Sequence, residues 1–219
     1  MKIHNFSAGP CILPKEVMAE AANAVVNYEN SGLSIIEMSH RSKLFVKVMD
    51  DAVALVKELL NVPSNYEVLF LQGGASLQFT MLAQNFLTEG TRAAYVNTGV
   101  WAAKAIKEAK LIGDVDVVAS SEDKNFTYIP KNISVPSDSS YLHFTSNNTI
   151  YGTQFSTFPI SDVGTIVDMS SDIFSKEINV SDFDMIYAGA QKNIGPAGAT
   201  LVIIKKDIVK KTSRVLPSM

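Results

Sequence analysis

The sequence contains little cysteine, tryptophan or histidine. Among 219 residues there are one cysteine, one tryptophan and three histidines. The single cysteine, Cys11, excludes an intrachain disulfide, an all-cysteine zinc site and a secreted disulfide framework. It suits the reducing environment of the cytoplasm. We therefore expect a cytoplasmic protein without a metal site.

A strong charge of one sign and a long apolar run are also missing. The net charge is -3 with both signs mixed along the chain, which argues against nucleic acid or an anionic membrane as a partner. No apolar run is long enough to cross a bilayer, and residues 1–10 lack the apolar core of a signal peptide. The 47% hydrophobic content is ample for a buried core.

Apolar patterns of helix and strand type alternate along the chain. We expect helices from Pro14 to a stop at Gly32 and over residues 43–60, 76–86 and 100–109. Strands are expected over residues 66–72, 93–97, 115–118, 141–144, 165–168, 184–188 and 199–204. The nearly continuous apolar run 66–72 is typical of a strand covered on both faces, and the polar residues 120–139 indicate a surface connection. The alternation predicts the α/β class, a mainly parallel sheet between helices with ligands at the carboxyl ends of its strands.

Lys192 is the most informative candidate for chemistry. It lies in residues 187–198 (YAGAQKNIGPAG), where an apolar strand runs into small residues and a Gly-Pro pair that no helix accommodates. A lysine on a turn at the rim of an α/β sheet is placed like a Schiff-base amine. A solvated loop lysine fits the same position, so the other residues at strand ends decide between the two.

Two further signals come directly after strands. Gly73 and Gly74 precede a helix, where a free N-terminus can bind an anion, although a plain turn has the same pattern. The pair lacks the rest of a P-loop or a dinucleotide fingerprint. Asp168 ends the run 164–168, where a carboxylate can pair with a cationic ring nitrogen or simply cap a helix.

Three weaker candidates complete the set. Trp101 follows a strand end, where it can stack on a planar cofactor or serve as a core residue. Thr149 lies after the strand 141–144 and can donate to a ring hydroxyl or form an ordinary turn. His40 and Arg41 lie between helices, as an anion clamp or a solvated pair. Together the phosphate cradle, aromatic ring, hydroxyl, aspartate and lysine match the needs of a pyridoxal-phosphate site.

Four segments resemble the phosphoserine aminotransferase family, which belongs to the class-V aminotransferases of fold type I. They are residues 5–10 (NFSAGP), 38–41 (MSHR), 61–66 (NVPSNY) and 187–198 (YAGAQKNIGPAG). The resemblance runs from the N-terminus to about Leu216. It implies a three-layer αβα architecture with a mainly parallel, seven-stranded sheet, a homodimer, and pyridoxal phosphate as cofactor. The implied reaction converts 3-phosphohydroxypyruvate and glutamate to phosphoserine and 2-oxoglutarate, for serine and in many bacteria also pyridoxine biosynthesis.

The resemblance also implies roles for single residues. Lys192 is the catalytic residue, which forms the Schiff base and carries protons, and Asp168 holds the ring nitrogen protonated. Trp101 stacks on the ring and Thr149 hydrogen-bonds near its hydroxyl. The expected phosphate contacts come from Gly74, Ala75, Ser76 and Gln191. His40 and Arg41 are expected to bind the distal anion of the substrate in the partner subunit's site.

The chain departs from the family in two places. Many bacterial members carry Gly-Arg where this chain has Ala75 and Ser76, so one formal charge is lost. This predicts somewhat weaker cofactor binding or simply marks a subfamily variant. The family chain also continues past residue 219 into a small C-terminal domain with the arginine that binds the substrate carboxylate. The expected domains are therefore an N-terminal segment (1–15) and a pyridoxal-phosphate-binding large domain (16–219), with the small domain absent and the sequence cut off.

Two other interpretations remain open on the sequence. A cysteine desulfurase or an alanine–glyoxylate-type aminotransferase shares the fold, but residues 39–41 and 191–193 argue against either. A truncated, non-catalytic or weakly active fragment that needs a C-terminal partner chain is the second interpretation. It predicts an exposed apolar surface where the small domain packs.

Overall fold

The computed structural model describes residues 3–87 and 90–209, so the last ten residues of the expected domain, 210–219, lie outside the described residues. The helices are α1 (Lys15–Asn27), α2 (Lys43–Leu59), α3 (Gly74–Phe86), α4 (Val100–Ala109) and α5 (Lys206–Val209), with 3-10 turns η1 (Tyr28–Asn30), η2 (Glu122–Lys124) and η3 (Val180–Asp182). The strands are β1 (Tyr66–Leu71), β2 (Arg92–Asn97), β3 (Asp114–Ser120), β4 (Ser139–Thr145), β5 (Asn147–Asn148), β6 (Thr153–Gln154), β7 (Thr165–Asp168), β8 (Met185–Gly189) and β9 (Thr200–Lys205).

Seven of these strands form one sheet in the order β1-β9-β8-β7-β4-β2-β3. The pairs from β3 to β8 are parallel, whereas β9 runs antiparallel to both of its neighbours. The expected α/β class and the mainly parallel seven-stranded sheet are therefore confirmed. The parallel strands all end at the same edge, which brings residues that are far apart in sequence together there.

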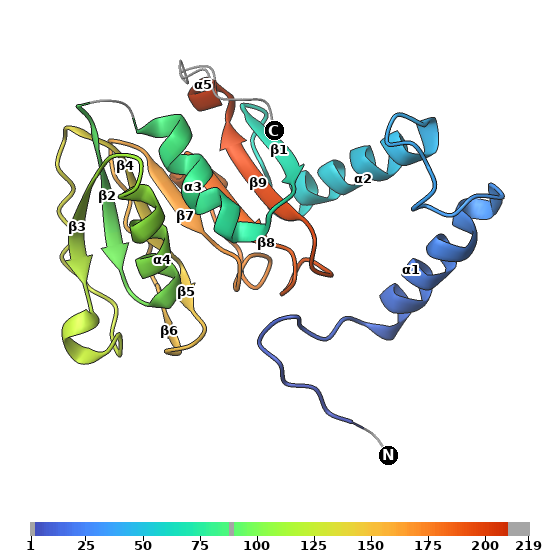
Figure 1. Ribbon diagram of the computed structural model, residues 1–219, viewed down its shortest axis with the longest axis horizontal. Helices are drawn as coiled ribbons and strands as arrows, with labels where there is room; N and C mark the ends of the chain where they lie inside the picture. The colour runs from blue at the N-terminus through green and yellow to red at the C-terminus, as the bar shows by residue number, and fades with distance from the viewer. Residues whose placement is uncertain (1–2, 88–89, 210–219) are drawn as a thin grey trace.

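The two faces of the sheet are covered differently. Helices α3 and α4 lie side by side on one face, as Figure 1 shows, and bury Phe79, Leu82 and Ile106 against it. The opposite face packs against the end of α2 and against loops, including η3. Ile129 and Ile133 from the polar segment 120–139 are partly buried there, so this segment is more than a surface connection.

Strand β1 does not match its expected environment. The apolar run predicted a strand covered on both faces, but β1 lies at the edge of the sheet and its burial alternates. Leu69 remains 40% exposed. The apolar content of β1 was predicted correctly from the sequence. The position of β1 at the edge of the sheet determines how much of each of its faces is covered.

The N-terminal part forms an arm, residues 3–60, much of which extends away from the sheet (Figure 1). Helix α1 buries none of its residues, and its Val26 is 80% exposed. Helix α2 begins at Ser42, whose hydroxyl accepts a hydrogen bond from the backbone N–H of Phe45 at 3.3 Å. Within the described residues, no helix has both the length and the apolar character that a bilayer crossing requires.

Candidate active site

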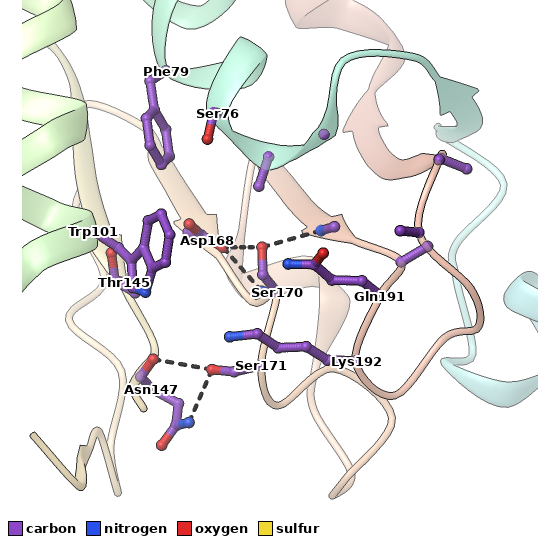
Figure 2. A pocket seen from close by; sticks show the side chains of 17 residues that line it. Ser76, Phe79, Trp101, Thr145, Asn147, Asp168, Ser170, Ser171, Gln191 and Lys192 are labelled. Carbon is purple, nitrogen blue, oxygen red and sulfur yellow. Dashed lines mark hydrogen bonds between the residues drawn. The ribbon is translucent and has the colours of Figure 1, made fainter. Parts of the chain in front are cut away.

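A cavity of about 240 Å³ opens at the carboxyl ends of the central strands. Figure 2 shows Trp101, Asp168, Gln191 and Lys192 around it, with the lysine side chain extending into the space. Residues at the starts of α3 and α4 line one part of the cavity, and residues of the turn after β8 line another. The lining residues are Gly74, Ala75, Ser76, Phe79, Trp101, Thr145, Asn147, Asp168, Ser170, Ser171, Gly189, Ala190, Gln191, Lys192, Ala197, Gly198 and Ala199.

The start of α3 has the backbone geometry of an anion-binding element. Gly73 precedes the helix with φ at 91°, a left-handed conformation that glycine adopts without strain. A Cβ on Gly73 would lie 2.3 Å from Cδ2 of Leu77, so the chain needs glycine there for space as well. The first N–H groups of a helix have no partner within it, and the helix dipole adds positive potential. Gly74, Ala75 and Ser76 therefore present donors to the cavity.

Asp168 is a buried carboxylate with fixed orientation. It is 4% exposed, and its Oδ1 accepts from the backbone N–H of Ser170 at 2.9 Å and from the Ser170 hydroxyl at 2.6 Å. The Ser170 hydroxyl oxygen in turn accepts from the backbone N–H of Gly189 at 3.0 Å. Burial raises the pKa of Asp168, while both hydrogen bonds from Ser170 and the charge of Lys192 oppose the rise. A cation bound in the cavity would favour the charged form further.

Lys192 is half-buried on the turn that follows β8. Its Nζ donates to the Thr149 hydroxyl at 3.2 Å. Its methylene stem lies against Gly9, where a Cβ would be 3.3 Å from Cγ of the lysine. The backbone N–H of Cys11 donates to the carbonyl of Gln191 at 2.9 Å, which ties the N-terminal segment to this turn. Thr149 therefore holds the amine, while residues 9–11 of the N-terminal segment contact the lysine stem and its turn.

Trp101 lies on the first turn of α4 and is partly buried at the cavity wall. The Nζ of Lys104, one turn further along α4, lies 4.5 Å from the centre of its ring. Such a cation–π contact favours one orientation of the indole. The ring can then stack on a flat ligand from a fixed position.

The structure brings most of the predicted residues together. Seven of them line the cavity, and Thr149 contacts Lys192 directly. His40 and Arg41 do not line it; both are exposed on the turn before α2. Their place in a partner subunit's site stays a prediction.

Several residues around the site were not found from the sequence, among them the cavity residues Phe79, Thr145 and Ser170, and Gly9 beside the Lys192 stem. Ser170 had a usable signal, because a serine two residues after a strand-end aspartate can bond back to it. In the sequence, Phe79 and Thr145 resemble ordinary helix and strand residues. Only the packing of α3 on the sheet shows that they line the cavity. Among the described residues, no cluster of three or more His, Cys, Asp or Glu side chains is placed to hold a metal ion.

An amine that can condense with an aldehyde faces a cavity that also holds a buried carboxylate for a positive ring nitrogen. Pyridoxal-phosphate-dependent enzymes with a mainly parallel α/β sheet require this arrangement. The chain belongs to the class-V aminotransferase family, whose family model matches residues 3–218.

Known relatives are similar over nearly all of this chain. The phosphoserine aminotransferase of Flavobacterium psychrophilum is 57% identical over 220 residues, which cover 100% of this chain and 62% of that protein. The solved phosphoserine aminotransferase of Bacillus circulans subsp. alkalophilus has a TM-score of 0.94 at 50% identity, over 97% of this chain and 60% of that one. The enzyme of Trichomonas vaginalis, solved with pyridoxal phosphate bound, has a TM-score of 0.91 at 36% identity, over 99% and 62%.

The cavity fits the cofactor that the family implies, pyridoxal phosphate. The hydroxyl of Thr145 is buried at the cavity wall and makes no hydrogen bond within the described part of the chain. A buried polar group without a partner is unusual and is readily explained by a ligand. The helix N-terminus suits a phosphate group, and Asp168 suits a pyridinium nitrogen.

Proposed function

We propose that this chain carries the cofactor-binding part of a phosphoserine:2-oxoglutarate aminotransferase. The observation that carries the proposal is the position of Lys192 Nζ, 3.2 Å from the Thr149 hydroxyl and in the same cavity as the buried Asp168. The identity of about 57% to named phosphoserine aminotransferases supports the substrate assignment. The chain spans about 61% of the length of these relatives, so the activity of the whole protein is part of the proposal.

The roles of the side chains follow from their positions. The N–H groups of Gly74, Ala75 and Ser76, with the Gln191 amide, bind the cofactor phosphate. Asp168 accepts a hydrogen bond from the protonated ring nitrogen. When bound, pyridoxal phosphate supplies an aldehyde carbon for the amino group and a ring that accepts electrons.

The remaining roles concern orientation and proton transfer. Trp101 packs on the ring face, and Thr149 binds near the ring hydroxyl. The Lys192 side chain extends into the cavity, where its amine would attach the cofactor and would move the proton on the substrate α-carbon.

The substrate and assembly assignments go one step further. We propose a homodimer in which His40 and Arg41 of one subunit bind the distal anion of the substrate in the other subunit's site. Their exposure and their distance from the cavity of their own chain are consistent with this. The same reaction chemistry also serves the pyridoxine-pathway substrate, and we include that use in the proposal.

The domain assignment is part of this proposal as well. Residues 16–219 are proposed as the large domain, and the small domain that the family resemblance implies is proposed to cover the apolar arm. Val26 on α1 and Ile36, 80% and 77% exposed, support this second component. A weakly active chain that needs a C-terminal partner is therefore the second candidate.

The experiment is a visible absorbance spectrum of the chain with pyridoxal phosphate, before and after phosphoserine, with Lys192→Ala as control. We expect a band that depends on Lys192 and that phosphoserine removes. Alanine as amino donor should leave the band unchanged, which separates this function from alanine–glyoxylate-type aminotransferases. A band that ignores phosphoserine would instead support the partner-dependent fragment. Absence of a Lys192-dependent band would contradict the proposal.

A further inference from the structure

A row of buried polar aromatic groups lies beneath α3 and α4, behind the cavity. The His143 Nε2 is 2.8 Å from the Tyr187 hydroxyl, and the hydroxyls of Tyr95 and Tyr141 are 2.9 Å apart. All four side chains are at most 2% exposed, and none lines the cavity. Burying polar groups lowers stability unless they are hydrogen-bonded. A row of four such side chains in the core therefore suggests a function.

The hydrogen bond between His143 and Tyr187 has a direction. Burial lowers the pKa of His143 to about 3, so the ring is neutral and carries one N–H. Its Nδ1 makes no hydrogen bond to any described residue. A hydrogen on Nδ1 would be a buried donor without an acceptor. Such unsatisfied donors are rarer in proteins than buried acceptors without a donor. The hydrogen therefore lies on Nε2 and is donated to the Tyr187 oxygen.

This direction leaves the Tyr187 hydroxyl hydrogen available for Asp168. The two residues are direct partners across β7 and β8, and their side chains lie on the same face of the sheet. Burial raises the pKa of Tyr187 most, and the nearby charge of Asp168 raises that pKa further, which is consistent with their closeness. The observed His143–Tyr187 hydrogen bond and the strand register together allow a directed chain from His143 through Tyr187 to the carboxylate of Asp168.

We infer that Tyr187 and His143 are positioning residues that keep the Asp168 carboxylate ionised and correctly oriented for a cationic ring nitrogen. Ser170 donates to Asp168 from the loop side. Tyr187, the register partner of Asp168 on the neighbouring strand, is the donor that we assign from within the sheet. Burial alone would favour the protonated acid, so these donors oppose it. The inference rests on the role of Asp168 in the proposed function.

The first test is Tyr187→Phe, which removes one oxygen from a buried ring. Trp101 is the single tryptophan, so quenching of its fluorescence reports pyridoxal phosphate binding. We expect binding about tenfold weaker or more, as for other residues that support a ligand-binding group. Tyr141→Phe is the matched control, because its hydroxyl contacts Tyr95 and not Asp168; we expect a change of less than about twofold.

A second readout needs no cofactor. In the unloaded chain, a carbon NMR titration of the Asp168 carboxyl, assigned with Asp168→Asn, should show a higher midpoint in Tyr187→Phe than in the wild type or in Tyr141→Phe. Equal midpoints and equal affinities in all three would overturn the inference. So would an equal loss in both phenylalanine variants, which would indicate a structural effect only.

His143 is tested by a pair of variants. His143→Leu removes the donor, and we expect it to weaken cofactor binding as Tyr187→Phe does. His143→Gln keeps an N–H close to the Nε2 position, and we expect it to restore most of the affinity. An equal loss in both variants would contradict a positioning role for His143. None of these measurements uses phosphoserine. A negative result would therefore contradict the roles of Tyr187 and His143 without bearing on the proposed substrate.

Discussion

Asp168 combines a cost in stability with a benefit in function. Its carboxylate is almost fully buried, and burial raises its pKa against the hydrogen bonds of Ser170. Without a cationic ligand the folded chain must hold a charge that water would solvate better. The same charge is what a protonated ring nitrogen requires.

We expect Asp168→Asn to stabilise the unloaded chain at neutral pH while weakening its cofactor binding. The folded-state pKa of Asp168 is raised, so the wild type loses stability as pH rises from the unfolded pKa through the folded one. Urea unfolding from acidic to neutral pH should show two curves that converge at low pH. Activity of the assembled enzyme should fall by roughly 100-fold or more. A variant that is less stable at every pH would contradict this account.

The burial of His143 should give the free energy of unfolding the opposite pH dependence. Its folded-state pKa is lowered from 6.5 to about 3 by burial, so below pH 6.5 the unfolded chain binds a proton that the folded chain does not. Each pH unit below 6.5 then costs about 1.4 kcal/mol, which amounts to about 2 kcal/mol by pH 5. His143→Gln, which does not titrate, should lack this share of the acid destabilisation. Parallel pH curves for the two chains would refute the prediction.

At the scale of single elements, the turn before α3 decides whether a phosphate can be bound. Gly73 is left-handed, and a side chain there would overlap Leu77. We expect Gly73→Ala to lower the free energy of unfolding by about 2 kcal/mol, from backbone strain and overpacking together. The shifted helix start should also weaken pyridoxal phosphate binding, as measured by Trp101 quenching.

Gly195→Ala is the control for this prediction. No atom lies within 4 Å of a Cβ built at Gly195, and its backbone is not left-handed. We expect a change within about 1 kcal/mol, in the stabilising direction, because alanine restricts the unfolded chain. If both substitutions had the same effect, the special geometry at Gly73 would not be the cause.

At the scale of the whole molecule, the arm formed by residues 3–60 is the exceptional part. Its exposed apolar side chains include Phe6, Val26 and Ile36, and α1 buries nothing within the described chain. Apolar surface of this extent marks an interface in soluble proteins. The proposed homodimer and the proposed small domain are the two candidates to cover it.

We expect the chain to self-associate at micromolar concentration and to bind a hydrophobic dye. The double variant Val26→Lys with Ile36→Lys should weaken association at least about tenfold, because buried apolar contacts then become charged. Sedimentation velocity measures the association. Substitution of Ile150, 62% exposed but outside the arm, serves as the control. A monomeric wild-type chain that binds no dye would contradict the prediction.

The sequence alone was sufficient for the alternation of elements, for the α/β class and for seven of the residues that line the cavity. Apolar periodicity depends on local spacing, and Gly73, Asp168 and Lys192 stand at recognisable strand ends. The resemblance of residues 187–198 to a known family then supplied the chemistry. These features depend on residues that are close together in the chain, so they can be predicted from the sequence.

The tertiary structure alone decided which distant residues meet. It placed β1 at the sheet edge, brought Gly9 against Lys192, and aligned His143, Tyr187 and Asp168 across three strands. It also separated His40 and Arg41 from the cavity of their own chain. Such contacts depend on strand order and register, which no local pattern specifies, because the same apolar strand can pair with any neighbour.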